Sequence, residues 1–299
     1  MAREHANVHG GKTVITKAVV PAAGRGTRLL PATRSQPKEM LPVGRKPTIQ
    51  HVVEELAAAG LAEVLLISGQ AKRAVEDHLD RDAAWNEEDH QPWMDLRFFH
   101  TRQSAPRGLA DAVSLAEPFA AGQPFVVALG DSIIVSRSRE PLLKRMLELH
   151  AKRRPAATIA VEEVPQGAVN RYGIVAPVEE AGRVFPIRAI VEKPSPSKAP
   201  SNLAVAGRYI LDSSVFDAIR QIKVGVGGEL QLTDALRLLL RQGREILCVR
   251  LRRGEHRLDV GSFLSYFQAF IELSLADPEH GEKLGRWLRA RLRGGRRRR

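Results

Sequence analysis

A glycine-containing segment near the N-terminus constrains the fold of this chain most. Residues 18–40 read AVVPAAGRGTRLLPATRSQPKEM, so an apolar run ends in small residues and is followed by the glycine pair Gly24 and Gly26. The cations Arg28 and Lys38 come next. Small residues let backbone N–H groups approach a ligand closely, and cations meet its phosphates. The segment therefore predicts a strand followed by a loop that binds a nucleotide.

The first half of the chain alternates between strand and helix patterns. Apolar runs predict strands over residues 17–22, 63–68, 95–101 and 124–129, and the apolar spacing predicts helices over 47–60, 71–79 and 109–116. Residues 80–94 are polar and predict a surface loop. Alternation with buried strands is typical of a Rossmann-like α/β fold, a mainly parallel mixed sheet flanked by helices. Ligands bind such sheets at the carboxyl ends of strands, where Gly24 and Asp131 both lie.

Shorter strands follow in the second half. We expect them over residues 158–164, 172–178, 184–192, 203–211 and 246–251, with helices over 233–241, 263–276 and 282–293. Thr233 or Asp234 could cap the first of these helices. The domain prediction is a flexible segment over 1–16, one main domain over 17–278, and a basic helix and tail over 279–299.

Composition limits the class of protein. The net charge is +12, but residues 281–299 alone carry +8, so the basicity belongs to a tail that ends in Arg296–Arg299. Two interpretations fit this charge: the tail is simply solvated, or it binds weakly to an anionic partner such as RNA. No apolar run is long enough to span a membrane, and no signal-peptide pattern occurs. With Cys248 as its single cysteine, the chain fits a cytoplasmic location.

The common alternatives for the glycine loop do not match. A Walker A loop needs Gly-x4-Gly-Lys-Ser/Thr, and a dinucleotide fingerprint needs a glycine where Leu29 stands. No HExxH or Gly-x-Ser-x-Gly motif occurs either. The pattern AAGRGTRLLPAT followed by PKEMLPV instead resembles the sugar nucleotidylyltransferase family, in particular its bacterial UTP–glucose-1-phosphate uridylyltransferases.

Two aspartates are implied by this resemblance to hold Mg²⁺. Asp131 follows the apolar strand pattern at 124–129, and Asp259 lies in Arg-Leu-Asp-Val-Gly-Ser, similar to the family's late Asp-x-Gly motif. Many relatives have a second acid directly after the first aspartate, where this chain has Ser132. Mg²⁺ prefers a few carboxylates together with phosphate and water. The alternative for both residues is a turn or helix-cap role.

A second motif is implied to bind the sugar phosphate. Glu192-Lys193-Pro194 matches the family's Glu-Lys-Pro, which assigns Glu192 to a sugar hydroxyl and Lys193 to the phosphate. Gly173, in a Tyr-Gly pair, matches the segment whose backbone contacts the hexose. The stretches APSNLA at 199–204 and GELQLTDA at 228–235 also match family blocks.

The base-binding segment departs from the uridylyltransferase pattern. Gln103 and Gly108 align with residues that bind the base, and a Gln amide can both donate and accept, as a uracil or thymine edge requires. The uridylyltransferases usually have Gly-Leu-Gly-His-Ala where this chain has Gly108-Leu-Ala-Asp-Ala112. That form is similar to the thymidylyltransferase branch, which keeps glucose-1-phosphate thymidylyltransferase open as an alternative.

The resemblance implies that UTP and glucose 1-phosphate give UDP-glucose and pyrophosphate. Arg28 and Lys38 would neutralise the triphosphate, Lys193 would hold the attacking phosphate, and the nucleotide pocket would include Ala23, Gly24 and Glu39. Relatives form dimers or tetramers, so a homo-oligomer is expected. The alternative from another class is a non-catalytic sugar-nucleotide sensor, which would be expected to have lost some of these charged residues.

Overall fold

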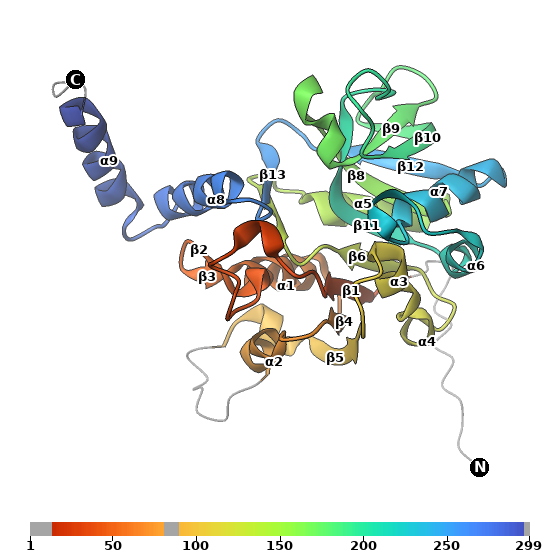
Figure 1. Ribbon diagram of the computed structural model, residues 1–299, viewed down its shortest axis with the longest axis horizontal. Coiled ribbons are helices and arrows are strands. Elements are labelled where there is room, and N and C mark those ends of the chain that lie inside the picture. Colours follow the sequence, from red (N-terminus) through yellow and green to blue (C-terminus); the bar gives the residue numbers. More distant parts are fainter. Residues whose placement is uncertain (1–13, 81–89, 296–299) are drawn as a thin grey trace, which may run out of the picture.

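A nine-stranded mixed sheet runs through the computed structural model, which describes residues 14–80 and 90–295 (Figure 1). The strand order is β5-β4-β1-β6-β11-β8-β12-β10-β9. The strands are β1 (Lys17–Ala22), β4 (Glu63–Ser68), β5 (Arg97–Arg102), β6 (Phe125–Ala128), β8 (Ala157–Glu163), β9 (Gly173–Pro177), β10 (Val184–Glu192), β11 (Leu203–Leu211) and β12 (Ile246–Arg250). Strands β5, β4, β1 and β6 are parallel neighbours, as are β8 and β12, whereas β11 and β10 pair antiparallel with their neighbours. The expected α/β fold with a mixed sheet is confirmed, and its longest parallel run lies in the N-terminal half.

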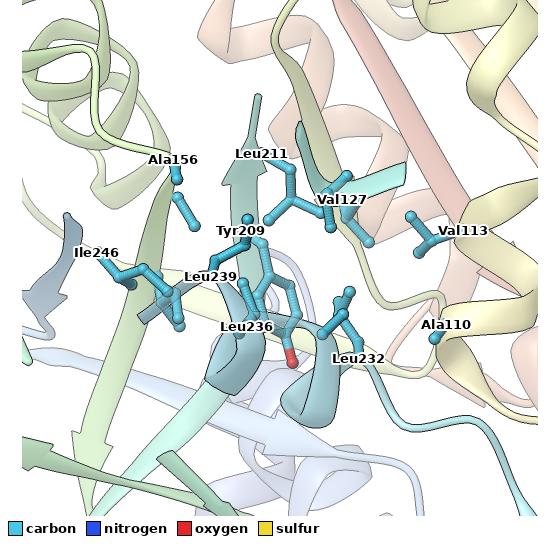
Figure 2. Packing of buried hydrophobic residues seen from close by; sticks show 14 of the residues in the cluster. Ala110, Val113, Val127, Ala156, Tyr209, Leu211, Leu232, Leu236, Leu239 and Ile246 are labelled. Atoms are coloured by element: carbon cyan, nitrogen blue, oxygen red, sulfur yellow. The ribbon is translucent and has the colours of Figure 1, made fainter. Parts of the chain in front are cut away.

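Each face of the sheet has its own apolar core, because successive side chains of a strand point to opposite faces. In β1, Val19 belongs to one core, and Ala18 and Val20 belong to the other. The first core is covered by α3 (Leu109–Ser114), α6 (Ser214–Gln221) and α7 (Leu232–Arg241), and the second by α1 (Thr48–Ala59), α2 (Arg73–Leu79) and α5 (Leu142–Arg153). Figure 2 shows Tyr209 of β11 lying beside Leu232 and Leu236 of α7.

A small ribbon and two C-terminal helices lie beside the main sheet. The antiparallel strands β7 (Ser132–Ser136) and β13 (Glu255–Asp259) form the ribbon, and β2 (Pro42–Val43) pairs with β3 (Lys46–Pro47). The helices α8 (Phe263–Leu275) and α9 (Gly281–Gly295) extend away from the body of the molecule (Figure 1). The remaining helical segments are short: α4 (Glu117–Ala120), η1 (Thr27–Leu29), η2 (Lys38–Met40), η4 (Pro92–Asp95), η5 (Gln166–Arg171) and η6 (Val226–Gly228).

Most expected elements are present, and four of the expected strands have the bounds that the sequence predicts: 17–22, 63–68, 184–192 and 203–211. The sequence expectations did not include α5, α6, β7 or β13. The expected helix at 47–60 begins at Thr48, with Pro47 before it, and ends at Ala59; Gly60 follows it with a left-handed φ of 91°.

The prediction that Thr233 or Asp234 caps α7 is wrong. The residue before the helix is Gln231, and no side chain caps it. Thr233 instead bonds to Glu192, and Asp234 pairs with Arg237. Both side chains therefore bond to other side chains and not to the free backbone N–H groups of the first turn.

Three expectations fall wholly or partly outside the described residues. The N-terminal segment 1–16 is described only from residue 14, the polar loop at 80–94 lacks residues 81–89, and the arginines 296–299 of the tail are also outside. Within residues 14–80 and 90–295, no helix is long and apolar enough to cross a membrane. The domain boundaries proposed at 17–278 and 279–299 stay a prediction.

Candidate active site

A cleft of about 350 Å³ lies at the carboxyl ends of the central parallel strands. Most residues that the sequence analysis selected line it: Ala23, Gly24, Lys38, Glu39, Gln103, Gly108, Asp131, Gly173, Glu192 and Lys193. Arg28 lines an adjoining cavity, which shares Gly24 and Lys38 with the cleft. Segments far apart in sequence thus converge at one edge of the sheet, as expected for an α/β fold.

The glycine loop after β1 is held by a short turn. Gly26 has a left-handed φ of 65°, and a Cβ there would lie 3.2 Å from Thr33 Cγ2. The Thr33 hydroxyl donates to the Gly26 carbonyl at 2.8 Å, which closes the loop. Leu29 is buried below it and Arg28 is exposed above. Only glycine adopts this conformation without strain, so the loop can present backbone N–H groups and the Arg28 guanidinium together.

Two lysine–carboxylate pairs lie where the nucleotide phosphates are expected. The Lys38 ammonium contacts the Asp131 carboxylate, and the buried Lys72 ammonium lies 2.5 Å from Glu39 Oε2. Burial alone would lower the pKa of Lys38, but the charges of Asp131 and Glu39 raise it above its usual value. Burial would likewise raise the pKa of Asp131, yet Lys38 holds it below its usual range. Lys38 is therefore a cation and Asp131 an anion at neutral pH.

Asp131 and Asp259 come together through the β7–β13 ribbon. Asp259 is opposite Ser132 in the ladder, and the Val260 N–H donates to the Asp131 carbonyl at 3.0 Å. Burial and the charge of Asp131 raise the pKa of Asp259. Neither aspartate caps α8, because Ser262 takes that position and accepts from the Ser265 N–H.

This pair of carboxylates fits a divalent cation. A cation between two half-buried acids would relieve their repulsion, and hard oxygen ligands are those that Mg²⁺ prefers. Within the described ranges no cluster of three or more His, Cys, Asp or Glu side chains could hold a metal alone. A metal here would thus take its other ligands from phosphate and water, which suits an ion bound together with a nucleotide.

The proposed sugar end of the cleft is built by β9, β10 and the start of α7. Glu192 is opposite Gly173 in the β9–β10 ladder, and the Thr233 hydroxyl donates to Glu192 Oε2 at 2.6 Å. A Cβ at Gly173 would lie 3.4 Å from that carboxylate, so glycine leaves room there. Lys193 has a left-handed φ of 44°, its N–H donates to the Tyr172 carbonyl, and its ammonium is 3.4 Å from Glu192 Oε1. A non-glycine residue in this conformation is uncommon and clusters at functional sites.

The opposite end contains Gln103 and Gly108. Gln103 follows β5, and its side-chain amide donates to the Gly108 carbonyl at 3.1 Å. Gly108 has a φ of 107°, and a Cβ there would lie 2.4 Å from the Leu230 carbonyl oxygen. A side chain at position 108 would therefore separate the loop from the segment before α7, so the close approach requires glycine.

Sequence reasoning missed several polar residues of the cleft. Arg257 lines it, donates to Glu162 Oε1 at 2.6 Å and lies 4.4 Å from the centre of the Tyr172 ring. Its position two residues before Asp259 is a usable signal, because residues i and i+2 of a strand share a face. Thr233 lies in the block 228–235 that the sequence singles out, but its bond to Glu192 had no local signal; Lys72, which pairs with Glu39 beside the cleft, had none either.

Comparison with known proteins identifies the class to which this fold and cleft belong. The chain belongs to the nucleotidyl transferase family, whose sequence model matches residues 17–274. It is 42% identical over 282 residues to a UTP–glucose-1-phosphate uridylyltransferase of Bacillus subtilis, covering 90% of this chain and 93% of the relative. The resemblance seen in the sequence is thus confirmed.

Solved structures agree. A crystal structure of UDP-glucose pyrophosphorylase complexed with UDP-glucose matches with a TM-score of 0.82 and 36% identity, covering 88% of this chain and all of the other. UTP-bound UGPase from Acinetobacter baumannii matches with a TM-score of 0.80 and 31% identity, covering 92% of this chain and 98% of the other. The expected enzyme class, a nucleotidyltransferase, is therefore shown by sequence and by fold.

Proposed function

We propose that the protein joins UTP and glucose 1-phosphate into UDP-glucose and releases pyrophosphate. The observation that carries this proposal is that one cleft brings the glycine loop and Lys38 together with the Glu192–Lys193 pair, while Arg28 lines the adjoining cavity. Each group of residues suits one substrate: the glycine loop and its cations suit a triphosphate, and a carboxylate beside an ammonium suits a sugar that carries both hydroxyls and a phosphate. The names of the relatives support the same reaction.

The chain's own residues would position both substrates and offset part of their negative charge. A phosphate oxygen of glucose 1-phosphate attacks the α-phosphorus of UTP, and the bond to the pyrophosphate leaving group breaks. The nucleophile is already an anion, so no general base is required. Lys193 would hold the attacking phosphate, while Arg28 and Lys38 would offset the charge of the triphosphate, with Arg28 nearer the leaving group. Ala23, Gly24 and Glu39 would line the nucleotide pocket.

We assign Asp131 and Asp259 as ligands of Mg²⁺, on the fit described above. A bound Mg²⁺ would neutralise triphosphate charge and fix the phosphate oxygens. The Lys38 ammonium that contacts Asp131 would then exchange this carboxylate for a phosphate oxygen, which leaves both groups paired.

The test is formation of UDP-glucose and pyrophosphate in equal amounts from UTP, glucose 1-phosphate and MgCl₂. We expect turnover with wild-type protein, none after chelation with EDTA, and restored turnover when Mg²⁺ is returned. Asp131→Asn should be folded by circular dichroism and inactive. Turnover that persists in excess EDTA would contradict the metal assignment, and an unfolded Asp131→Asn protein would favour a structural role for that residue.

A second candidate is a glucose-1-phosphate thymidylyltransferase. The observation in its favour is Gly108-Leu-Ala-Asp-Ala112, similar to the thymidylyl branch. The cleft, the cations and the aspartates would keep the same roles. Preference for dTTP over UTP with the same sugar phosphate would establish this alternative.

We also propose that the protein forms a homo-oligomer through α8. Leu264, Phe267, Ile271 and Leu275 share one face of this helix and are 41–68% exposed. Helix α9 is strongly basic, so like charges oppose contact between two copies of it, whereas α8 carries Glu272 as its single charge. An apolar, nearly uncharged helix can meet its own copy across a two-fold axis. Sedimentation should show a dimer or larger species that Phe267→Asp converts to a monomer; a monomeric wild type would refute the proposal.

A cytoplasmic location and an anionic partner for the C-terminal tail stay predictions. The location rests on the single cysteine Cys248, a buried free thiol. The tail prediction rests on arginines that lie outside the described residues. If a protein that lacks residues 294–299 binds RNA as well as wild type does, the tail has no role in RNA binding.

A further inference from the structure

The side chain of Gln103 is fixed by hydrogen bonds within the protein. Its backbone N–H donates to the Ser68 carbonyl at the end of β4, and only 6% of the residue is exposed. The side-chain nitrogen Nε2 donates to the Gly108 carbonyl at 3.1 Å and to Asp111 Oδ2 at 2.7 Å. Both N–H groups of the amide are therefore committed to partners in the chain.

These partners dictate which way the amide faces. A backbone carbonyl and a carboxylate are both acceptors, so the amide nitrogen, not its oxygen, must face them. Asp111 is itself held by Arg107, whose Nε lies 3.0 Å from Oδ1. Because Asp111 lies in the first turn of α3, a regular element fixes its position. A rotation of the amide by 180° would place its oxygen against two acceptors.

Gln103 consequently offers the cleft an acceptor and no donor. Its Oε1 makes no hydrogen bond within residues 14–80 and 90–295, and Gln103 lines the cleft. The expectation that this amide both donates to and accepts from a base is thus wrong for the arrangement in this structure. A lone acceptor distinguishes the pyrimidines, since N3 of uracil and thymine carries a hydrogen and N3 of cytosine is an acceptor.

We propose that Asp111 is a positioning residue that makes the base site selective for uracil or thymine over cytosine. It acts through Gln103, by holding the Gln103 carbonyl oxygen toward the N3 position of the base. A cytosine would place its N3 lone pair against this oxygen and leave both without a donor, which is costly in a buried site. The inference rests on the proposed function, because it takes the Gln103 end of the cleft to be the base site.

The residue type at position 111 bears directly on the orientation of the Gln103 amide. The sequence has Asp where the uridylyltransferase pattern has His within Gly-Leu-Gly-His-Ala. An ionised carboxylate can only accept, whereas a histidine ring can donate or accept, so Asp111 specifies the amide orientation without ambiguity.

The test is the ratio of the dissociation constants of CDP and UDP, measured by calorimetry on the full chain. Asp111→Ala removes the shorter of the two hydrogen bonds that orient the amide and leaves only the one to the Gly108 carbonyl, so the amide can rotate and the ratio should fall at least tenfold. Asp111→Asn keeps an acceptor oxygen and should stay within threefold of wild type. Asp217→Ala, the same change at an exposed site on α6, is the matched control and should leave the ratio unchanged.

The outcomes separate this inference from the proposed function. If Asp111→Ala weakens both nucleotides equally, Asp111 supports the fold of the site and the inference is wrong. If wild type binds CDP as tightly as UDP, Gln103 does not select the base and the inference is likewise wrong. A third outcome is possible: wild type prefers UDP over CDP, Asp111→Ala loses this preference, and yet no turnover occurs with UTP. That result would contradict the proposed reaction and uphold the role of Asp111.

Discussion

Arg208 lies in the centre of β11, with no exposed surface, and joins the core to the turn after Asp131. Its Nη2 donates to Glu55 Oε2 at 2.7 Å and to the Ser132 carbonyl at 2.8 Å, its Nε reaches the same Glu55 oxygen at 3.1 Å, and its Nη1 donates to the Gly207 carbonyl at 3.2 Å. Arg208→Met keeps similar length but removes every donor. Glu55, which is 15% exposed at its side chain, would be left as an unpaired carboxylate.

The expected loss in free energy of unfolding is about 3–5 kcal/mol, the cost of removing one partner of a buried ion pair. That is a large share of the roughly 5–15 kcal/mol that stabilises a typical domain. Urea unfolding followed by circular dichroism measures it. The double variant Arg208→Met/Glu55→Leu should recover part of the loss, because no charge is then stranded. A single variant within about 1 kcal/mol of wild type, the low end of salt-bridge contributions, would refute this reasoning.

Three further predictions concern the cleft and the core. Lys193→Ala should lower kcat/KM at least a hundredfold, or about 2.7 kcal/mol of transition-state stabilisation, whereas near-wild-type kinetics would exclude its role at the attacking phosphate. Thr233→Val removes the donor to Glu192 and should raise KM for glucose 1-phosphate with little change in KM for UTP; equal changes in both would point to a general loss of structure. Burial lowers the pKa of His150 to about 4, so the unfolded chain binds more protons between that value and the usual 6.5. Stability is therefore complete above pH 6.5 and falls as the pH drops, by about 2 kcal/mol at pH 5. His150→Gln should remove this part of the pH dependence, as measured by urea unfolding at pH 7.5 and pH 5; an unchanged slope would contradict it.

Three of the four strands predicted with the correct bounds, β1, β4 and β11, are largely buried on both faces, whereas β10 mixes buried and exposed residues. The apolar residues at 64–67, and those on either side of Gly207 and Arg208 in 203–211, form a local pattern strong enough to predict these strands. The strands β7 and β13 are short, half-buried and far apart in the chain, so their pairing has no local signature. By contrast, the spacing of the buried residues Leu142, Met146 and His150 is helical, and α5 was predictable from the sequence.

The residues of the candidate site also fall into two groups, those with a local sequence signal and those without one. Residues next to strand ends, such as Gly24 and Asp131, were predictable because the carboxyl ends of parallel strands meet at one edge. The bond from Thr233 to Glu192 depends on how α7 packs on β10, and the orientation of Gln103 depends on Asp111 of α3. Such contacts are set by tertiary packing, which a residue pattern does not encode.

The central claim, transfer of a uridylyl group to glucose 1-phosphate, is tested most directly by comparing nucleotides. Pyrophosphate release is measured with purified protein, Mg²⁺ and glucose 1-phosphate, using UTP, dTTP, CTP, ATP and GTP in turn. We expect the highest kcat/KM for UTP, with CTP far below it. Preference for dTTP would move the enzyme to the thymidylyl branch, and no turnover with any nucleotide would contradict the proposed reaction.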